Sequence, residues 1–136
     1  MQFDPNRDYP LGVRRPELVQ TPTGTGLQEV TLGAAREGRL AGAELRATPD
    51  TLRLQADVAR AAGRSQLAQN LERAAELAGL PDEELLEIYT ALRPHRSTAG
   101  ELESWARRLD EQAAPRTAAF VREAAGVYAE RNLLAV

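Results

Sequence analysis

The sequence of 136 residues contains no cysteine and only one histidine, His95. Without cysteine it offers neither a disulfide framework nor a thiol nucleophile, and a zinc site with sulfur ligands is excluded. A single histidine has no second imidazole with which to share a metal ion, so we expect no metal site in this chain.

Lysine is also absent, and all 17 basic residues are arginine, which we ascribe to the composition of the genome. The formal net charge is −3. A chain of this charge has no basic field to displace counterions, so we expect no nucleic-acid partner. No run of about 18 apolar residues is present, and the first residues lack the order of a signal peptide. We expect a cytoplasmic chain without a membrane partner.

Large apolar side chains are scarce. Hydrophobic residues make up 43% of the chain, but 24 residues are alanine, and leucine, isoleucine, valine and phenylalanine together number only 29. Alanine favours helices, yet each buries little surface at roughly 25 cal/mol per Å². We therefore expect a thin helical protein that completes its core against another protein.

Residues 1–47 differ in composition from the rest, because they hold four of the eight prolines and six of the ten glycines. Only TLGAAREG, residues 31–38, has the threonine start and glycine stop of a short helix. We predict that residues 1–47 form an extended arm with this one short helix, laid along the surface of a partner. Five apolar side chains would anchor it there: Phe3, Tyr9, Leu11, Val13 and Leu18.

Residues 48–136 form the predicted helical domain. Helix starts are indicated at Thr48, Ser65, Asp82, Thr98 and Pro115, with a glycine stop near residue 63. Thr98 and Glu101 have the spacing of a capping box. The fold class predicted is all-α, an open bundle of about four to five short helices, each marginal alone, preceded by the extended arm.

The segment ALRPHRST, residues 91–98, is the cluster that most resembles a chemical site. Arg93 and Arg96 could clamp a phosphate or carboxylate. However, Arg93 falls in the predicted last turn of a helix, where a cation is favoured, and Ser97 or Thr98 would cap the next helix. We interpret the segment as a joint whose arginines pair with carboxylates of this chain or of a partner.

Other polar clusters also have structural explanations. The acidic run DEELLE, residues 82–87, is interpreted as the solvated start of a helix. Ser65 is interpreted as a cap, and Trp105 as a core or interface residue on the face of Leu102 and Leu109. No catalytic constellation emerges, and we predict no catalytic or cofactor-binding residue in this chain.

Several stretches together resemble the small, or gamma, subunit of adenosylcobalamin-dependent diol and glycerol dehydratases. The resemblance runs from about Asp8 to Arg131 in matching order and spacing. It is carried by DYPL at 8–11, TPDTLRLQADVARAAGR at 48–64, NLERAAEL at 70–77, PDEELLEIYTALRPHRST at 81–98 and AAFVREAAGVYAER at 118–131.

The resemblance implies a role in an enzyme that turns 1,2-diols or glycerol into an aldehyde and water. Such enzymes contain large (alpha), medium (beta) and small subunits, usually two of each. Adenosylcobalamin and a metal ion, potassium or calcium, are bound by the other subunits, and the cofactor carries the difficult step. The small subunit docks on the large one and supplies no known catalytic group.

Two departures from the family pattern bear on function. His95 stands where the family commonly has an aromatic ring, so we expect it to fill a packing slot. Only seven residues precede Asp8, whereas some members carry an N-terminal extension associated with packaging into a bacterial microcompartment. We expect no such packaging through this chain. The preference between 1,2-propanediol and glycerol stays open, because the pocket lies on another subunit.

We predict subunit-interface roles for residues of large or cationic type, which dominate interface energetics. These are Tyr9, Pro10, Leu11, Arg93, Arg96 and Trp105. Two alternatives remain: a free-standing helical adaptor that binds another protein, and a small enzyme that uses Arg93, His95 and Arg96 on a phosphorylated substrate.

Overall fold

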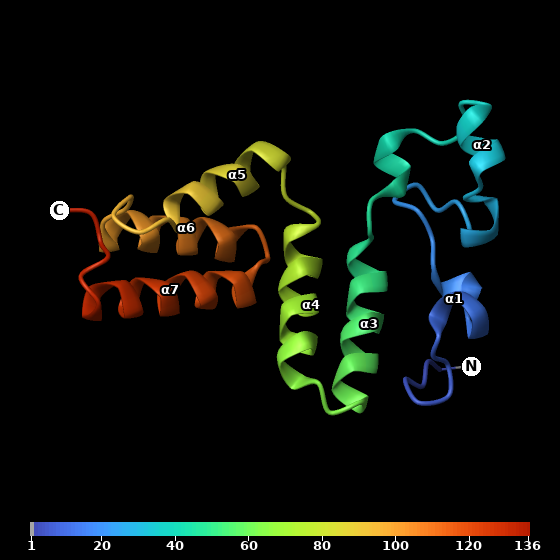
Figure 1. Ribbon diagram of the computed structural model, residues 1–136, viewed down its shortest axis with the longest axis horizontal. Helices are drawn as coiled ribbons and strands as arrows, with labels where there is room; N and C mark the ends of the chain where they lie inside the picture. Colours follow the sequence, from blue (N-terminus) through green and yellow to red (C-terminus); the bar gives the residue numbers. More distant parts are fainter. Residues whose placement is uncertain (1) are drawn as a thin grey trace. The chain divides into compact units, whose positions relative to one another are not determined.

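The computed structural model describes residues 2–136, which fall into two compact units, one reaching to Ala78 and one running from Gly79 to Val136. Helices connected by turns make up both units (Figure 1). Within residues 2–136 there is no strand, only an isolated bridge between Gln20 and Gly26. The predicted all-α class is confirmed.

The first unit begins with five short helical segments, where the sequence indicated only one. They are α1 (Leu11–Arg14), η1 (Pro16–Leu18), η2 (Leu27–Glu29), α2 (Leu32–Arg36) and η3 (Gly42–Leu45). The predicted helix is α2, with Thr31 as its cap and Gly38 at a φ of 73° beyond its end. The residues before position 48 are thus more folded than the predicted arm.

Side-chain hydrogen bonds hold this N-terminal region together. The hydroxyls of Thr21, Thr23 and Thr25 all donate to Oε2 of Glu44, at 2.8, 2.6 and 3.4 Å. These contacts join residues about twenty positions apart, so no local pattern reveals them. The compositional break at 47/48 does not coincide with the division at 78/79 between the units.

Two longer helices complete the first unit: α3 (Pro49–Ala61) and α4 (Ser65–Leu77). They lie side by side and run in opposite directions (Figure 1). As predicted, Thr48 caps α3 and accepts a hydrogen bond from the Thr51 N–H. Ser65 is not a cap but the first residue of α4, which has no side-chain cap. Small side chains dominate the buried contact between α3 and α4, which is formed by the alanines at 56, 59 and 68 together with Leu71.

The second unit contains α5 (Asp82–Ala91), α6 (Ala99–Glu111) and α7 (Pro115–Glu130). α6 and α7 form an antiparallel hairpin (Figure 1). The predicted capping box of Thr98 and Glu101 starts α6, and Pro115 starts α7. The largest fully buried side chains of the described chain, Leu102, Leu109 and Val121, form the core of this hairpin with buried alanines.

Glu84 connects α5 to α6. Residues 82–87 do begin a helix, and Asp82, Glu83 and Glu87 are exposed as expected, but for Glu84 the interpretation as a solvated side chain is wrong. The residue is only 6% exposed. Its Oε1 lies 2.7 Å from Arg108 Nε, and its Oε2 accepts a hydrogen bond from the Gln112 amide at 3.1 Å. A buried carboxylate requires such partners, and these come from 24 and 28 positions along the chain.

Candidate partner-binding surfaces

The six predicted interface residues divide between the two units. Tyr9, Pro10 and Leu11 belong to the first unit, and Arg93, Arg96 and Trp105 to the second. Leu11 is 2% exposed and packs inside its own unit, whereas Tyr9 is 54% exposed. Pro10 is exposed as well, so of these three N-terminal residues Tyr9 and Pro10 can contact another molecule without a change in this chain, whereas Leu11 cannot.

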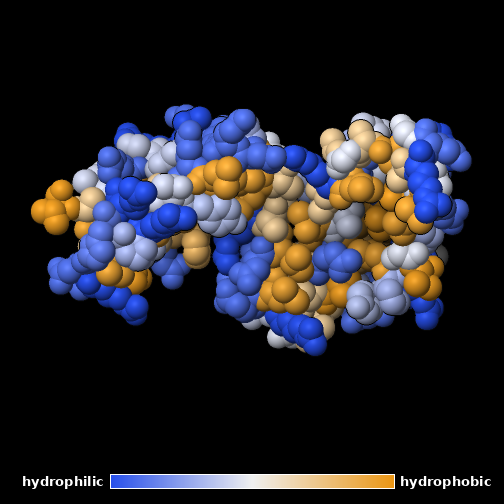
Figure 2. All heavy atoms as spheres, turned by 45° about the horizontal axis from the view of Figure 1, so that its top comes forward, coloured by the Kyte–Doolittle hydropathy of each residue, from blue (hydrophilic) through white to orange (hydrophobic). Residues whose placement is uncertain are grey.

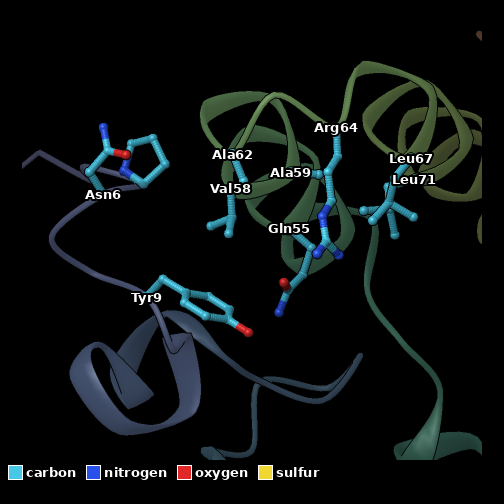
Figure 3. Close-up of a pocket in the computed structure, with 10 residues that line it drawn as sticks. Asn6, Tyr9, Gln55, Val58, Ala59, Ala62, Arg64, Leu67 and Leu71 are labelled. Carbon is cyan, nitrogen blue, oxygen red and sulfur yellow. The ribbon is translucent and has the colours of Figure 1, made fainter.

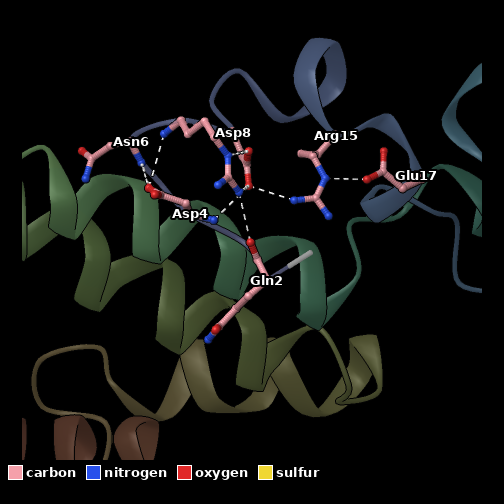
Figure 4. A network of polar contacts seen from close by, with 7 residues as sticks. Gln2, Asp4, Asn6, Asp8, Arg15 and Glu17 are labelled. Carbon is pink, nitrogen blue, oxygen red and sulfur yellow. Dashed lines mark hydrogen bonds and ion pairs between the residues drawn. The ribbon is translucent and has the colours of Figure 1, made fainter.

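A polar network fixes the backbone on both sides of Tyr9 (Figure 4). Asp8 is 4% exposed and accepts hydrogen bonds from Arg7 Nε at 2.7 Å and from Arg15 Nη1 at 2.8 Å. The Asp4 N–H also donates to Asp8. The hydrogen bond from Arg7, with that from the Asp4 backbone and that from Arg15, holds the pKa of the Asp8 carboxyl well below its usual range.

Tyr9 lines a pocket of about 460 Å³ in the first unit (Figure 3). One wall is apolar and comes from α3 and α4, with Val58, Ala59, Ala62, Leu67 and Leu71. Gln55 of α3 and Arg64, which immediately precedes α4, project from the same side of the pocket as this wall. Tyr9 and Asn6 lie opposite, in the N-terminal segment, and Pro5 completes the lining (Figure 3). The guanidinium of Arg64 lies beside the amide of Gln55, and the hydroxyl of Tyr9 points toward that amide.

Sequence reasoning missed Arg64 and Gln55. The available signal was Gly63, correctly predicted as a helix stop, because the chain turns there in a Schellman motif. Gly63 has a φ of 73°, its N–H donates to the Arg60 carbonyl, and the Arg64 N–H donates to the Ala59 carbonyl at 2.8 Å. This turn places Arg64 between the two helices that form the apolar wall.

A second pocket, of about 480 Å³, lies in the second unit and joins Arg96 to Trp105. Leu86, Thr90 and Ala91 of α5 supply its apolar and small side chains, and Glu87 and Ser97 complete it. Trp105 is half-buried, and the guanidinium of Arg108 lies 5.3 Å from its ring centroid. The structure thus brings together two of the predicted interface residues, while Arg93 is not among the lining residues.

The joint at residues 91–98 is present, but several details differ from prediction. Helix α5 ends at Ala91, so Arg93 lies beyond its last turn. His95 is exposed at a φ of 62° and does not fill a packing slot in this chain. Arg93 and Arg96 form no ion pair with any residue in the 2–136 range. Their pairing with a partner's carboxylates stays a prediction.

Backbone contacts with the end of the chain close the joint. The His95 N–H donates to the Leu133 carbonyl at 2.7 Å, and the Ala135 N–H donates to the Ser97 carbonyl at 2.8 Å. The Ser97 hydroxyl donates to the Ala91 carbonyl, so Ser97 bridges the turn and Thr98 caps α6. Each of these groups therefore has a structural role in the turn.

Neither a metal-binding cluster nor a membrane-spanning helix is found among residues 2–136. No group of three or more histidine, cysteine, aspartate or glutamate side chains there could hold a metal ion. None of the described helices combines the length and the hydropathy needed to cross a bilayer.

Fold and surfaces together describe a class of helical chain in which each unit presents a pocket that combines apolar side chains with an arginine. Comparison with known proteins names the family. The chain belongs to the dehydratase small subunit family, which matches residues 5–135.

Two relatives illustrate the similarity. The propanediol dehydratase small subunit of Salmonella typhimurium is 51% identical over 128 residues, and that of Citrobacter freundii is 50% identical over 128 residues. Each match covers 93% of this chain and 74% of the relative. The resemblance stated from the sequence is confirmed.

Proposed function

We propose that this chain is the non-catalytic small subunit of an adenosylcobalamin-dependent propanediol or glycerol dehydratase, and that it supports assembly and stability of the large subunit. Family membership supports the enzyme class. The structural observation that carries the accessory role is the distribution of apolar side chains: eight of the fourteen buried hydrophobic residues of the described chain are alanine, while several large apolar side chains are exposed. Those more than half exposed include Tyr9, Val13, Leu32, Leu45, Leu86 and Tyr89.

Exposed apolar side chains of this size would contribute more to stability if a partner protein covered them. Burial of a leucine stabilises by about 1.5–3 kcal/mol relative to exposure, and large contiguous apolar surface typically marks a protein-binding site. Apolar atoms form broad surface patches over the first unit (Figure 2). Binding to a larger subunit would bury such patches and so stabilise both proteins.

The proposed partners are the large and medium dehydratase subunits, two copies of each, in a cytoplasmic complex. Adenosylcobalamin and its accompanying potassium or calcium ion would lie in those subunits. The residues of this chain do not fit either group: its one imidazole is exposed on a turn, and the described acidic side chains do not cluster. No step of the reaction is therefore assigned to this chain.

Co-expression with the large and medium subunits tests the proposal. The purified complex would be assayed for aldehyde formed from 1,2-propanediol and from glycerol, with adenosylcobalamin and potassium. We expect the chain to co-purify and activity to fall when it is omitted. The ratio of the two rates would give the substrate preference. Full activity and stability of the other two subunits without this chain would refute the accessory role and favour the adaptor hypothesis.

A further inference from the structure

We propose that the pocket beside Tyr9 binds a carboxylate of a partner polypeptide, an aspartate or glutamate side chain next to an apolar residue. The proposal rests on the proposed function, in which that polypeptide is a dehydratase subunit. It assigns the docking contact to one pocket, one cation and one chemical class of ligand.

Among the described residues that line this pocket, Arg64 alone has a charged side chain. The chain as a whole carries a net charge of −3, yet no acidic side chain is among the described residues that line the pocket. The pocket of the second unit differs, because Glu87 lies in it together with Arg96. The charge of the Tyr9 pocket is thus complementary to an anion, and guanidinium groups suit carboxylates in particular.

Three hydrogen-bonding side chains converge on this pocket without partners of their own. Arg64, Tyr9 and Gln55 make no side-chain hydrogen bond or ion pair with any residue from 2 to 136. Arg60, one turn earlier in α3, contrasts with them, since it pairs with Asp57 and Glu72 on the surface of the same helix pair. A bound carboxylate could accept from all three donors at once (Figure 3).

Local structure favours an anion at this place. The Schellman turn at Gly63 fixes the backbone of Arg64, which immediately precedes α4. The first turn of α4 contains no acidic residue and has no side-chain cap, so the positive end of its dipole is not compensated by this chain. A carboxylate held by Arg64 would lie next to that end.

The apolar wall identifies the ligand as part of a protein rather than an isolated ion. Val58, Leu67 and Leu71 line the same pocket as the polar groups, and its volume of about 460 Å³ is enough for an aliphatic side chain besides the carboxylate. Leu67 is 43% exposed and Tyr9 54% exposed, so apolar surface continues beyond the pocket. A folded partner can cover this rim as well as the pocket itself.

Binding of variants to the purified large and medium subunits tests the assignment. In Arg64→Gln the charge is lost at nearly constant size, and in Tyr9→Phe only the hydroxyl is lost. Arg36→Gln, at an exposed arginine of α2, is the matched control. We expect Kd to rise at least about tenfold for Arg64→Gln and about threefold for Tyr9→Phe, because truncating one member of a buried charged pair is costly. Arg36→Gln should leave Kd unchanged.

The outcomes separate the two proposals. Binding by the wild-type chain with an unchanged Kd for Arg64→Gln would overturn the assignment of this pocket and leave the accessory role intact. No binding by the wild-type chain would refute both. Circular dichroism and urea unfolding of each variant establish that a loss of affinity is not a loss of fold.

A photo-crosslinking amino acid at position 55 identifies the ligand's source. We expect a crosslinked peptide from the large or medium subunit that contains aspartate or glutamate beside an apolar residue. A crosslink to a second copy of this chain would contradict the assignment. Hexanoate is the probe for a small-molecule site: chemical shifts at Ala59 and Ala62 on its addition, together with an unchanged subunit Kd for Arg64→Gln, would show that the pocket serves a free carboxylate instead.

Discussion

Replacement of alanine by glycine should have opposite effects at two positions of the α6–α7 hairpin. Ala113 follows α6 with a φ of 58°, in a turn where its N–H donates to the Asp110 carbonyl and the Ala114 N–H to the Leu109 carbonyl at 2.8 Å. This is the same Schellman motif that has a glycine at position 63. Ala119 is an exposed residue inside α7.

The expected magnitudes follow from backbone conformation alone. The left-handed region costs a non-glycine residue about 1–2 kcal/mol, and glycine loses about 0.5–1 kcal/mol more than alanine on ordering. Ala113→Gly should therefore stabilise the second unit by about 0.5–1 kcal/mol. Ala119→Gly should destabilise it by about 1 kcal/mol, the helix-interior difference between the two residues.

Thermal unfolding followed by circular dichroism at 222 nm measures both effects. For a unit of this size, 1 kcal/mol corresponds to a shift of about 4–8 °C in the unfolding midpoint, so the two variants should melt on opposite sides of the wild type. Amide hydrogen exchange of residues 99–130 assigns the change to this hairpin. Destabilisation by both substitutions would refute the reasoning, because it would mean that the backbone strain at Ala113 does not contribute to stability.

Two further predictions concern the core of the second unit and the acid stability of the first. Leu109→Ala should lower the free energy of unfolding by about 2–5 kcal/mol, because Leu109 is fully buried. The control Leu86→Ala, at an exposed leucine, should change it by less than about 0.5 kcal/mol. Equal losses of the two variants in urea unfolding would contradict the assigned core. The Arg7 and Arg15 hydrogen bonds lower the pKa of Asp8 in the folded chain. The stability that this carboxylate contributes is therefore present above its pKa in the unfolded chain, about 4, and is lost as pH falls from there toward its pKa in the folded chain. Asp8→Asn should flatten the slope of urea midpoint against pH below about 4, and an unchanged slope would show that Asp8 is not the responsible group.

Local signals in the sequence predicted most helix boundaries correctly. Thr31, Thr48 and Thr98 cap the helices that follow them, Pro115 begins the last helix, and Gly63 ends α3. Each of these residues acts within a few positions of itself, so its effect is readable without knowledge of the fold.

The turns built without glycine were not predicted. His95, Ala113 and Asn132 all adopt positive φ, and no residue type marks the first two as such. His95 is held in this conformation by the hydrogen bond from its N–H to the carbonyl of Leu133, a residue that is close in space but distant in sequence. Burial of Glu84 was missed for a related reason, since its partners Arg108 and Gln112 lie on another helix.

The candidate sites could be predicted only in part. Tyr9, Arg96 and Trp105 were chosen by residue type, and the structure places each of them in a pocket. Arg64 and Gln55 were missed, because they face Tyr9 only after α3 and α4 pair and the N-terminal segment folds beside them. A pocket formed by three segments has no signature in any one of them.

The closure of the 92–97 turn by residues 133 and 135 has a consequence for the order in which the two pockets form during translation. The turn and its pocket need hydrogen bonds from Leu133 and Ala135, and Tyr128 holds the Leu92 carbonyl at 2.5 Å. These residues are translated after every described residue that lines either pocket. The described residues that line the Tyr9 pocket end at Leu71. Because chains fold from the N-terminus as they are made, the first unit can engage a partner while the second is still being synthesised, and the Arg96 surface can join only afterwards.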